Sequence, residues 1–240
     1  MYQLDYVEVY DLLMRSRGKD YKNEAAEVRR LVRERKPGAS SLLDAACGTG
    51  LHLRFLVDLF ERTEGLDLSE DMLTFAGKMI PGVPLHTGDM RNFELKSRFD
   101  AVICMFAIPH LRSGQELKRA VNRLVGHLTP QGILLIEPWF RPAEFIPGYV
   151  ASDVVSQGDR VIHRLSHSVL ERDCDDRVQM TVHYADATPD GGIRHVVETV
   201  RMSLFTDTQY REAFAAAGCT AELIDLEHFP RGVWVAKRLR

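Results

Sequence analysis

Residues 41–56, with the sequence SLLDAACGTGLHLRFL, join an apolar run, a turn of small residues and a stretch with helical spacing. The apolar run predicts a buried strand, and the stretch after the turn predicts a helix. Glycine in such a turn lets the backbone approach a ligand closely, and parallel α/β sheets bind their ligands beyond the strand ends. Taken alone, this junction is typical of nucleotide, dinucleotide and adenosyl sites alike.

Alternating strands and helices follow this junction. Further strands are predicted by apolar runs at residues 62–68, 83–89, 99–106 and 133–139, the last preceded by a turn at 130–132. Helices are predicted by apolar periodicity at residues 51–60, 69–80 and 113–128. Ser69 is a favourable N-cap for the second of these helices. The order indicates an α/β fold, a mostly parallel twisted sheet with helices on both faces.

The flanking segments depart from this order. Residues 1–36 contain two amphipathic stretches joined by a polar link, and they predict an N-terminal helical cap. Within residues 150–204, three period-two runs separated by turn signals predict an inserted antiparallel β-meander. A helix and two closing strands are then expected to the end of the chain. We expect a single domain over residues 1–240, with a Rossmann-like core made of 38–140 and 205–240.

Composition excludes several classes of protein. Lys and Arg total 31 against 34 for Asp and Glu, and this net charge of −3 disfavours a nucleic-acid-binding face. The four cysteines show no CxxC spacing and do not cluster with histidine, so we expect neither a metal site nor a disulfide framework. The N-terminal residues resemble no signal peptide, and no apolar run is long enough for a membrane span. These features predict a cytoplasmic protein.

Acidic residues at the ends of successive strands narrow the choice of ligand. A dinucleotide fingerprint starting at Gly48 would require Gly or Ala where the chain has Leu53. Asp67 follows Gly50 by seventeen residues and ends the second strand, where it can accept both ribose hydroxyls. Asp89 and the backbone of Met90 end the third strand, where an adenine edge could hydrogen-bond. The alternative is a tight strand-to-helix turn with surface acids.

The glycine turn, the ribose acid and the third-strand acid occur in an order that resembles the class I methyltransferases, which bind S-adenosylmethionine. The resemblance implies a cofactor site made of Asp44, Ala46, Gly48, Gly50, Asp67, Leu68, Met72, Asp89 and Met90. Asp44, Ala46, Gly48 and Gly50 would lie at the methionine end. Ala46 departs from the pattern, because many members have glycine there. Alanine restricts the backbone conformations that are available at this position.

A more specific resemblance extends over nearly the whole chain. The segments VYDLLMRSRGKDY, LLDAACGTGLHL, GLDLSEDML, GDMRNFEL, MFAIPHL, IEPWF and RLSHSV are similar to the N-methyltransferases of nucleotide-linked amino sugars. Those enzymes convert a TDP-amino-deoxysugar to its dimethylamino form, as in desosamine and mycaminose of macrolide antibiotics. The resemblance implies S-adenosylmethionine as cofactor, S-adenosylhomocysteine as product, and a TDP-linked amino sugar as substrate. It leaves open whether the amine is at C-3 or C-4.

The resemblance also implies roles for residues outside the glycine turn. Tyr10 would lie over the cofactor, where an aromatic face suits a sulfonium cation. Arg17, Lys19 and Tyr21 would bind the cofactor and help to close the N-terminal helices over it. Met105 would line the cofactor pocket, with core packing as the alternative.

His110 would receive the proton of the sugar ammonium or orient the amine, and a purely structural hydrogen bond is the alternative. Pro109 precedes it where the family has no proline, and the loop is one residue shorter, so the position of His110 relative to the sugar is in question. Trp139 would pack against the sugar or thymine, followed by Phe140 where the family tends to have a second Trp. The candidates for the diphosphate and base are Tyr149, Ser166, His167, Ser168 and Arg231.

Other interpretations remain open. The polar residues of RLSHS usually face solvent on a meander, and Arg231 is the best phosphate ligand of the set because its fork matches phosphate oxygens. Rival functions are an O- or N-methyltransferase of another small acceptor and a nucleotide-binding module without catalysis. The sequence leaves the oligomeric state open, a homo-oligomer included.

Overall fold

A computed structural model of the chain describes residues 4–172 and 174–239. Its central sheet has seven strands in the order β10-β11-β5-β4-β1-β2-β3. Their bounds are β1 Ser41–Ala45, β2 Arg62–Asp67, β3 Leu85–Thr87, β4 Phe99–Cys104, β5 Leu128–Ile136, β10 Cys219–Leu226 and β11 Phe229–Arg238. β1 to β5 run parallel, whereas β10 and β11 pair antiparallel. The predicted α/β class with a mostly parallel sheet is confirmed.

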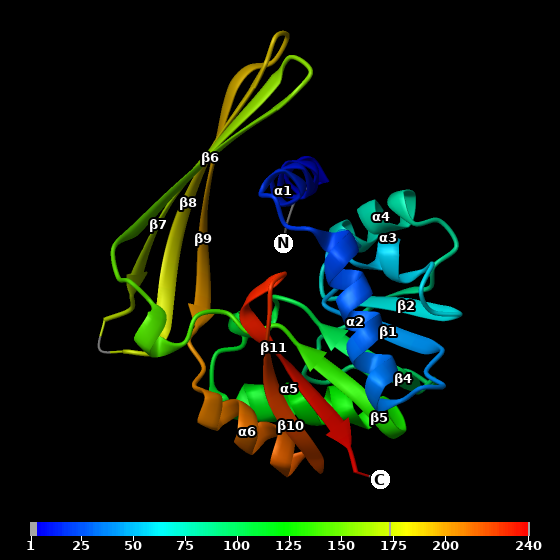
Figure 1. The fold of residues 1–240 in the computed structure, drawn as a ribbon. Helices are drawn as coiled ribbons and strands as arrows, with labels where there is room; N and C mark the ends of the chain where they lie inside the picture. The colour runs from blue at the N-terminus through cyan, green and yellow to red at the C-terminus, as the bar shows by residue number, and fades with distance from the viewer. Residues whose placement is uncertain (1–3, 173, 240) are drawn as a thin grey trace.

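Helices cover both faces of this sheet (Figure 1). On one face, α5 (Gly114–Gly126) and α6 (Asp207–Ala216) pack their apolar sides against β4, β5 and β11. On the other face, α2 (Tyr21–Arg35) packs against β5 and β11, and its apolar side shares a buried cluster with β1 and β4. The strands between these layers are buried on both sides, which is why they are apolar throughout. Because β1, β2, β4 and β5 run parallel, their carboxyl ends lie at the same edge of the sheet.

Helix starts follow local sequence rules, whereas one helix length does not. The Ser69 hydroxyl accepts a hydrogen bond from the backbone N–H of Met72 at 3.3 Å and begins α4 (Glu70–Met79), as predicted. The helix predicted at residues 51–60 is shorter, because α3 spans only Leu53–Leu56. The N–H of Leu59 bonds the carbonyl of Leu56, so the chain leaves the helix in a tight turn while its apolar side chains stay buried.

The turn predicted at residues 130–132 lies inside β5. Gln131 has φ of 58°, and the pairing of β4 with β5 shifts register at this point. The turn signal therefore marks a bulge in a longer strand, and the strand predicted to end at Trp139 ends at Ile136.

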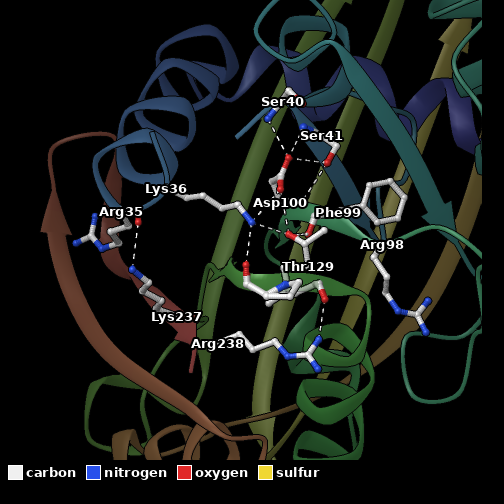
Figure 2. Close-up of polar contacts among 12 residues, drawn as sticks. Arg35, Lys36, Ser40, Ser41, Arg98, Phe99, Asp100, Thr129, Lys237 and Arg238 are labelled. Atoms are coloured by element: carbon white, nitrogen blue, oxygen red, sulfur yellow. Dashed lines mark hydrogen bonds and ion pairs between the residues drawn. The ribbon is translucent and has the colours of Figure 1, made fainter. Parts of the chain in front are cut away.

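At the amino-terminal edge of the sheet, Asp100 joins four elements (Figure 2). Its Oδ2 accepts the backbone N–H of Ser40 at 3.0 Å and the Ser41 hydroxyl at 2.9 Å. Its Oδ1 lies 2.9 Å from Lys36 Nζ and accepts the Thr129 hydroxyl at 3.0 Å. Partial burial raises the pKa of Asp100, but these hydrogen bonds outweigh it and hold the pKa well below its usual range. The network ties the end of α2 to β1, β4 and β5.

A second sheet has the order β6-β7-β8-β9, with β6 Tyr149–Gln157, β7 Arg160–Leu170, β8 Arg177–Thr188 and β9 Gly192–Ser203. It projects from the core, and α1 (Leu4–Ser16) packs against one of its faces through Val9 and Leu13 (Figure 1). The sequence predicted three strands here, so β6 is an addition. Its side chains are mostly exposed, and YVASDVVSQ lacks a strict apolar alternation. No helix among the described residues is long and apolar enough to cross a membrane.

Candidate active site

A cavity of about 450 Å³ lies beyond the carboxyl ends of β1, β4 and β5, beneath the link between α1 and α2. Of the residues predicted to bind the cofactor, those lining it are Tyr10, Arg17, Lys19, Tyr21, Asp44, Ala46, Gly48 and Met105. Arg231, predicted to bind substrate, also lines it. The cavity thus brings together the cap, the glycine turn and the last hairpin, three segments far apart in the chain.

The turn after β1 has backbone angles that favour glycine. Gly48 has φ of 55° and Gly50 has φ of 80°, and a Cβ on Gly50 would lie 3.1 Å from Ile80. Ala46 has φ of 63°, the left-handed conformation that glycine adopts without strain. This angle gives a physical reason for the glycine that many class I members carry at this position.

Asp67 holds this turn in place. Its Oδ2 accepts the backbone N–H of Gly48 at 2.8 Å, and its Oδ1 accepts the backbone N–H of Ser69 at 2.8 Å. Desolvation raises the Asp67 pKa despite these hydrogen bonds. Each carboxylate oxygen retains a further lone pair for a ligand hydroxyl. The side chain that we expect at the ribose therefore also fixes the shape of the glycine turn.

Asp44 lies one residue before the end of β1, at the base of the cavity, and is 2% exposed. Burial raises its pKa to about 7, with His52 opposing and Asp67 reinforcing the shift. A buried carboxylate of this kind favours a cationic ligand, because a positive charge stabilises its ionised form. Tyr10 is likewise desolvated, which raises its pKa to about 12.

Two buried carboxylates that the sequence analysis did not select also face the cavity. Glu24 is 1% exposed, and its Oε2 lies 2.7 Å from His52 Nε2. The Tyr21 ring packs edge-on against the His52 ring, with centroids 4.9 Å apart. Glu137 is 4% exposed, and its two oxygens accept hydrogen bonds from Lys19 Nζ at 2.7 and 3.0 Å.

Two residues that line the cavity carry a buried polar atom without a hydrogen-bond partner among the described residues. Within the part of the chain that the structure describes, Thr49 Oγ1 and Arg231 Nε are buried and make no hydrogen bond. The Arg231 guanidinium carbon lies 3.9 Å from the centre of the Phe140 ring. Burial lowers the Arg231 pKa, against the opposing charges of Glu137 and Glu144. Unpaired buried donors are rare in native proteins and suit a ligand with acceptor oxygens.

Several predicted cofactor residues lie outside the cavity lining. The Asp89 carboxylate pairs with Arg91, whose Nε lies 2.9 Å from Oδ1, and this hydrogen bond lowers the Asp89 pKa. Met90 packs partly buried against the main core, and Met72 is 4% exposed within α4. Leu68 is 67% exposed. Their proposed contacts with adenine and ribose stay predictions.

His110 ends the 3₁₀ turn η1 (Ile108–His110) and does not line the cavity. Although solvent reaches its side chain, neighbouring atoms desolvate the imidazole and lower its pKa, against the attraction of Asp67. Met105 and Phe106, just before this turn, do line the cavity, and Phe106 has φ of 58°.

The other predicted substrate residues lie at or near the second sheet, also outside the cavity lining. Trp139 is 8% exposed and lies in an apolar cluster with Val178, Met202 and Leu204. Ser166 and Ser168 are buried on the face of β7 that α1 covers, while His167 points to the opposite, exposed face. Tyr149 is 58% exposed and pairs with Ser168.

The match to the methyltransferase domain family covers residues 42–132, which run from within β1, through the glycine turn, to the first half of β5. Together with this match, a mostly parallel sheet with a glycine turn after β1, an acid at the end of β2 and a cavity at that edge identifies a class I, S-adenosylmethionine-dependent methyltransferase.

Comparison with known proteins narrows this class. The chain is 47% identical over 224 residues to the dTDP-3-amino-3,6-dideoxy-alpha-D-glucopyranose N,N-dimethyltransferase of Streptomyces fradiae, covering 93% of this chain and 87% of that protein. It is 42% identical over 239 residues to the dTDP-4-amino-2,3,4,6-tetradeoxy-D-glucose N,N-dimethyltransferase of Saccharopolyspora spinosa, covering 99% and 94%. The crystal structure of Streptomyces venezuelae DesVI matches with a TM-score of 0.92 at 44% identity, covering 99% of this chain and 100% of that one. The chain belongs to the TDP-amino-sugar N,N-dimethyltransferases.

Proposed function

We propose that this protein transfers two methyl groups in succession to the amine of a TDP-linked amino-deoxysugar, in the biosynthesis of an antibiotic or related natural product. The observation that carries the proposal is identity of 42–47% to named sugar N,N-dimethyltransferases over 93–99% of the chain. The similarity includes the cap and the second sheet, which lie outside the methyltransferase domain match. A cytoplasmic location suits an enzyme that uses a nucleotide-linked sugar.

S-adenosylmethionine is the cofactor, and when bound it supplies a methyl group activated on a sulfonium. The residues proposed to hold it are four that line the cavity, Ala46 and Gly48 in the turn with Asp44 and Tyr10. We add Asp67, which lies outside the cavity lining and accepts the backbone N–H of Gly48. The orphaned hydroxyl of Thr49 supports this assignment, because a ligand with polar groups would give it a partner. We further propose that residues 1–36 act as a cap, and residues 150–204 as an inserted wall, around a single core.

The acceptor amine must lose a proton before its lone pair can attack. We propose His110 as the group that receives this proton or orients the amine, supported by its place after β4 and its lowered pKa. Replacement by alanine is expected to leave the dissociation constant of S-adenosylhomocysteine unchanged and to lower turnover. Unchanged turnover across the pH range would reduce His110 to a packing role.

For the diphosphate and thymidine we propose Arg231, together with Trp139, Tyr149, Ser166, His167 and Ser168. Arg231 is supported most directly, since its Nε is buried without a partner in the described structure and a guanidinium matches phosphate oxygens.

The deciding experiment is mass spectrometry of products after incubation with S-adenosylmethionine and paired TDP-amino sugars carrying the amine at C-3 or C-4. We expect one of the pair to gain two methyl masses and the other to react poorly. No methyl gain on any TDP-amino sugar, with transfer to an unrelated amine or hydroxyl, would refute the proposal.

A further inference from the structure

A cage of acidic and aromatic groups surrounds one ammonium inside the cavity. Lys19 Nζ lies 2.7 Å from the nearer oxygen of Glu137 and 3.4 Å from Glu24 Oε2. It also lies 5.4 Å from the centre of the Phe106 ring and 5.9 Å from that of Tyr21. Carboxylates and aromatic faces are the groups that bind an alkylammonium ion. All five residues line the cavity.

The two carboxylates of this cage differ in their other partners. Glu24 has His52 at 2.7 Å as a second partner. Among the described residues, the Glu137 carboxylate receives hydrogen bonds from Lys19 alone. Glu137 therefore keeps a compensating cation only while Lys19 stays in place, and a buried carboxylate left alone is strongly unfavourable.

The two partners are also held differently. Glu137 directly follows β5, and its backbone N–H bonds the carbonyl of Cys104 on β4 at 3.1 Å, so it is anchored to the sheet. Lys19 lies in the short link between α1 and α2, next to Gly18 with φ of 73°. A lysine side chain has four rotatable bonds, and its position on a link lets the ammonium leave while the carboxylate stays.

We propose that Glu137 is the recognition site for the acceptor's amino group, and that the substrate ammonium replaces the Lys19 ammonium on this carboxylate. The inference rests on the proposed function. An amino sugar presents a primary ammonium with the same charge and the same three donors as Lys19 Nζ, so the cage is preformed for it. Arg231 lines the same cavity, where burial lowers its pKa and the charge of Glu137 opposes that shift. The cavity therefore contains both a cation that matches phosphate and an anion that matches an amine.

The test measures binding in the presence of S-adenosylhomocysteine, so that no methyl transfer occurs. Calorimetry compares the TDP-amino sugar with the TDP sugar that carries a hydroxyl in place of the amine. Glu137→Gln is expected to weaken binding of the amino sugar by about 10- to 100-fold and to change binding of the hydroxyl sugar by no more than about twofold. Glu137→Asp keeps the charge and is expected to recover part of the loss.

The matched control is Glu212→Gln. Glu212 pairs with Lys118 at 2.9 Å on the surface, so this variant also leaves one lysine without its carboxylate, away from the cavity. We expect it to bind both sugars as the unaltered protein does.

Each other outcome overturns the inference. Equal weakening of both sugars would make Glu137 a support of the cavity wall, and weaker S-adenosylhomocysteine binding would assign it to the cofactor. Unchanged amino-sugar binding in Glu137→Gln, with the unaltered protein active on that sugar, would refute this inference but not the proposed function. An unaltered protein that binds no TDP-amino sugar would refute both.

Discussion

Replacing Asp44 by Asn is expected to stabilise the ligand-free protein at neutral and alkaline pH. Burial raises the pKa of Asp44 from 3.8 to about 7. A carboxylate with a raised pKa binds its proton more tightly in the folded state, so the folded state loses stability as pH rises from the unfolded value through the folded one. Each unit of pKa shift corresponds to about 1.4 kcal/mol, and roughly three units correspond to about 4 kcal/mol above pH 7. Asn has nearly the same shape and carries no charge.

Urea denaturation at pH 5, 6, 7 and 8 measures this effect. The difference in free energy of unfolding between Asp44→Asn and the unaltered protein should increase by about 3 kcal/mol from pH 5 to pH 8. Asp58→Asn is the matched control, because Asp58 is exposed on the segment after the same strand. Its free energy of unfolding is measured at the same four pH values for comparison.

The same variant is expected to bind S-adenosylhomocysteine at least about tenfold more weakly, because an ionised carboxylate can accept charge-assisted hydrogen bonds from the ammonium of its amino-acid end. Stability would then rise while function falls, the usual trade-off at a binding site. A stability difference that does not vary between pH 5 and pH 8 would refute the reasoning, since Asp44 would then keep one protonation state across the range.

Three further predictions concern single residues. Ala46→Gly should raise the free energy of unfolding by about 1 kcal/mol in urea denaturation, because it relieves a left-handed alanine at φ of 63°; an unchanged or lower value would contradict this. Asp100→Asn should lower it by about 1–3 kcal/mol at pH 7 without changing S-adenosylhomocysteine binding. Because the Asp100 pKa is depressed, this loss should shrink as pH falls below about 4, and a constant loss would contradict the argument. Arg231→Ala should raise the KM for the TDP-sugar with cofactor affinity unchanged, and an unaltered KM would remove it from the phosphate site.

The order of core elements could be predicted because its signals are local. Residues 99–104 are apolar at nearly every position since both faces of β4 are covered, and Ser69 caps α4 within one turn of sequence. β6 was missed because most of its side chains are exposed, and its backbone pairing with β7 leaves no apolar pattern. The helix predicted at residues 51–60 is longer than α3, because a tight turn after Leu56 continues the helical spacing of apolar side chains.

The residues of the candidate site likewise include some with a local sequence signal and some without one. The glycine turn and Asp67 could be selected because their positions follow from strand ends read along the chain. The Lys19–Glu137 pair joins residues 118 positions apart, and the pairing of His52 with Glu24 joins residues 28 positions apart. Apolar periodicity along the sequence reports local secondary structure, so it does not predict contacts between residues this far apart. Glu137 did carry one usable signal, an acid directly after a buried apolar strand, the same signal that selected Asp67.

The two edges of the central sheet carry carboxylates in opposite electrostatic conditions. At the amino-terminal edge, hydrogen bonds from the chain satisfy Asp100 and lower its pKa, so its charge stabilises the fold (Figure 2). At the carboxyl-terminal edge, burial raises the pKa of Asp44 and Asp67, so their charges oppose folding. The network around Asp100 stabilises the fold at one edge, so the fold tolerates the destabilising carboxylates of Asp44 and Asp67 at the other. A cationic ligand would stabilise the ionised form of those carboxylates. The asymmetry agrees with the position of the cavity, which lies at the carboxyl-terminal edge.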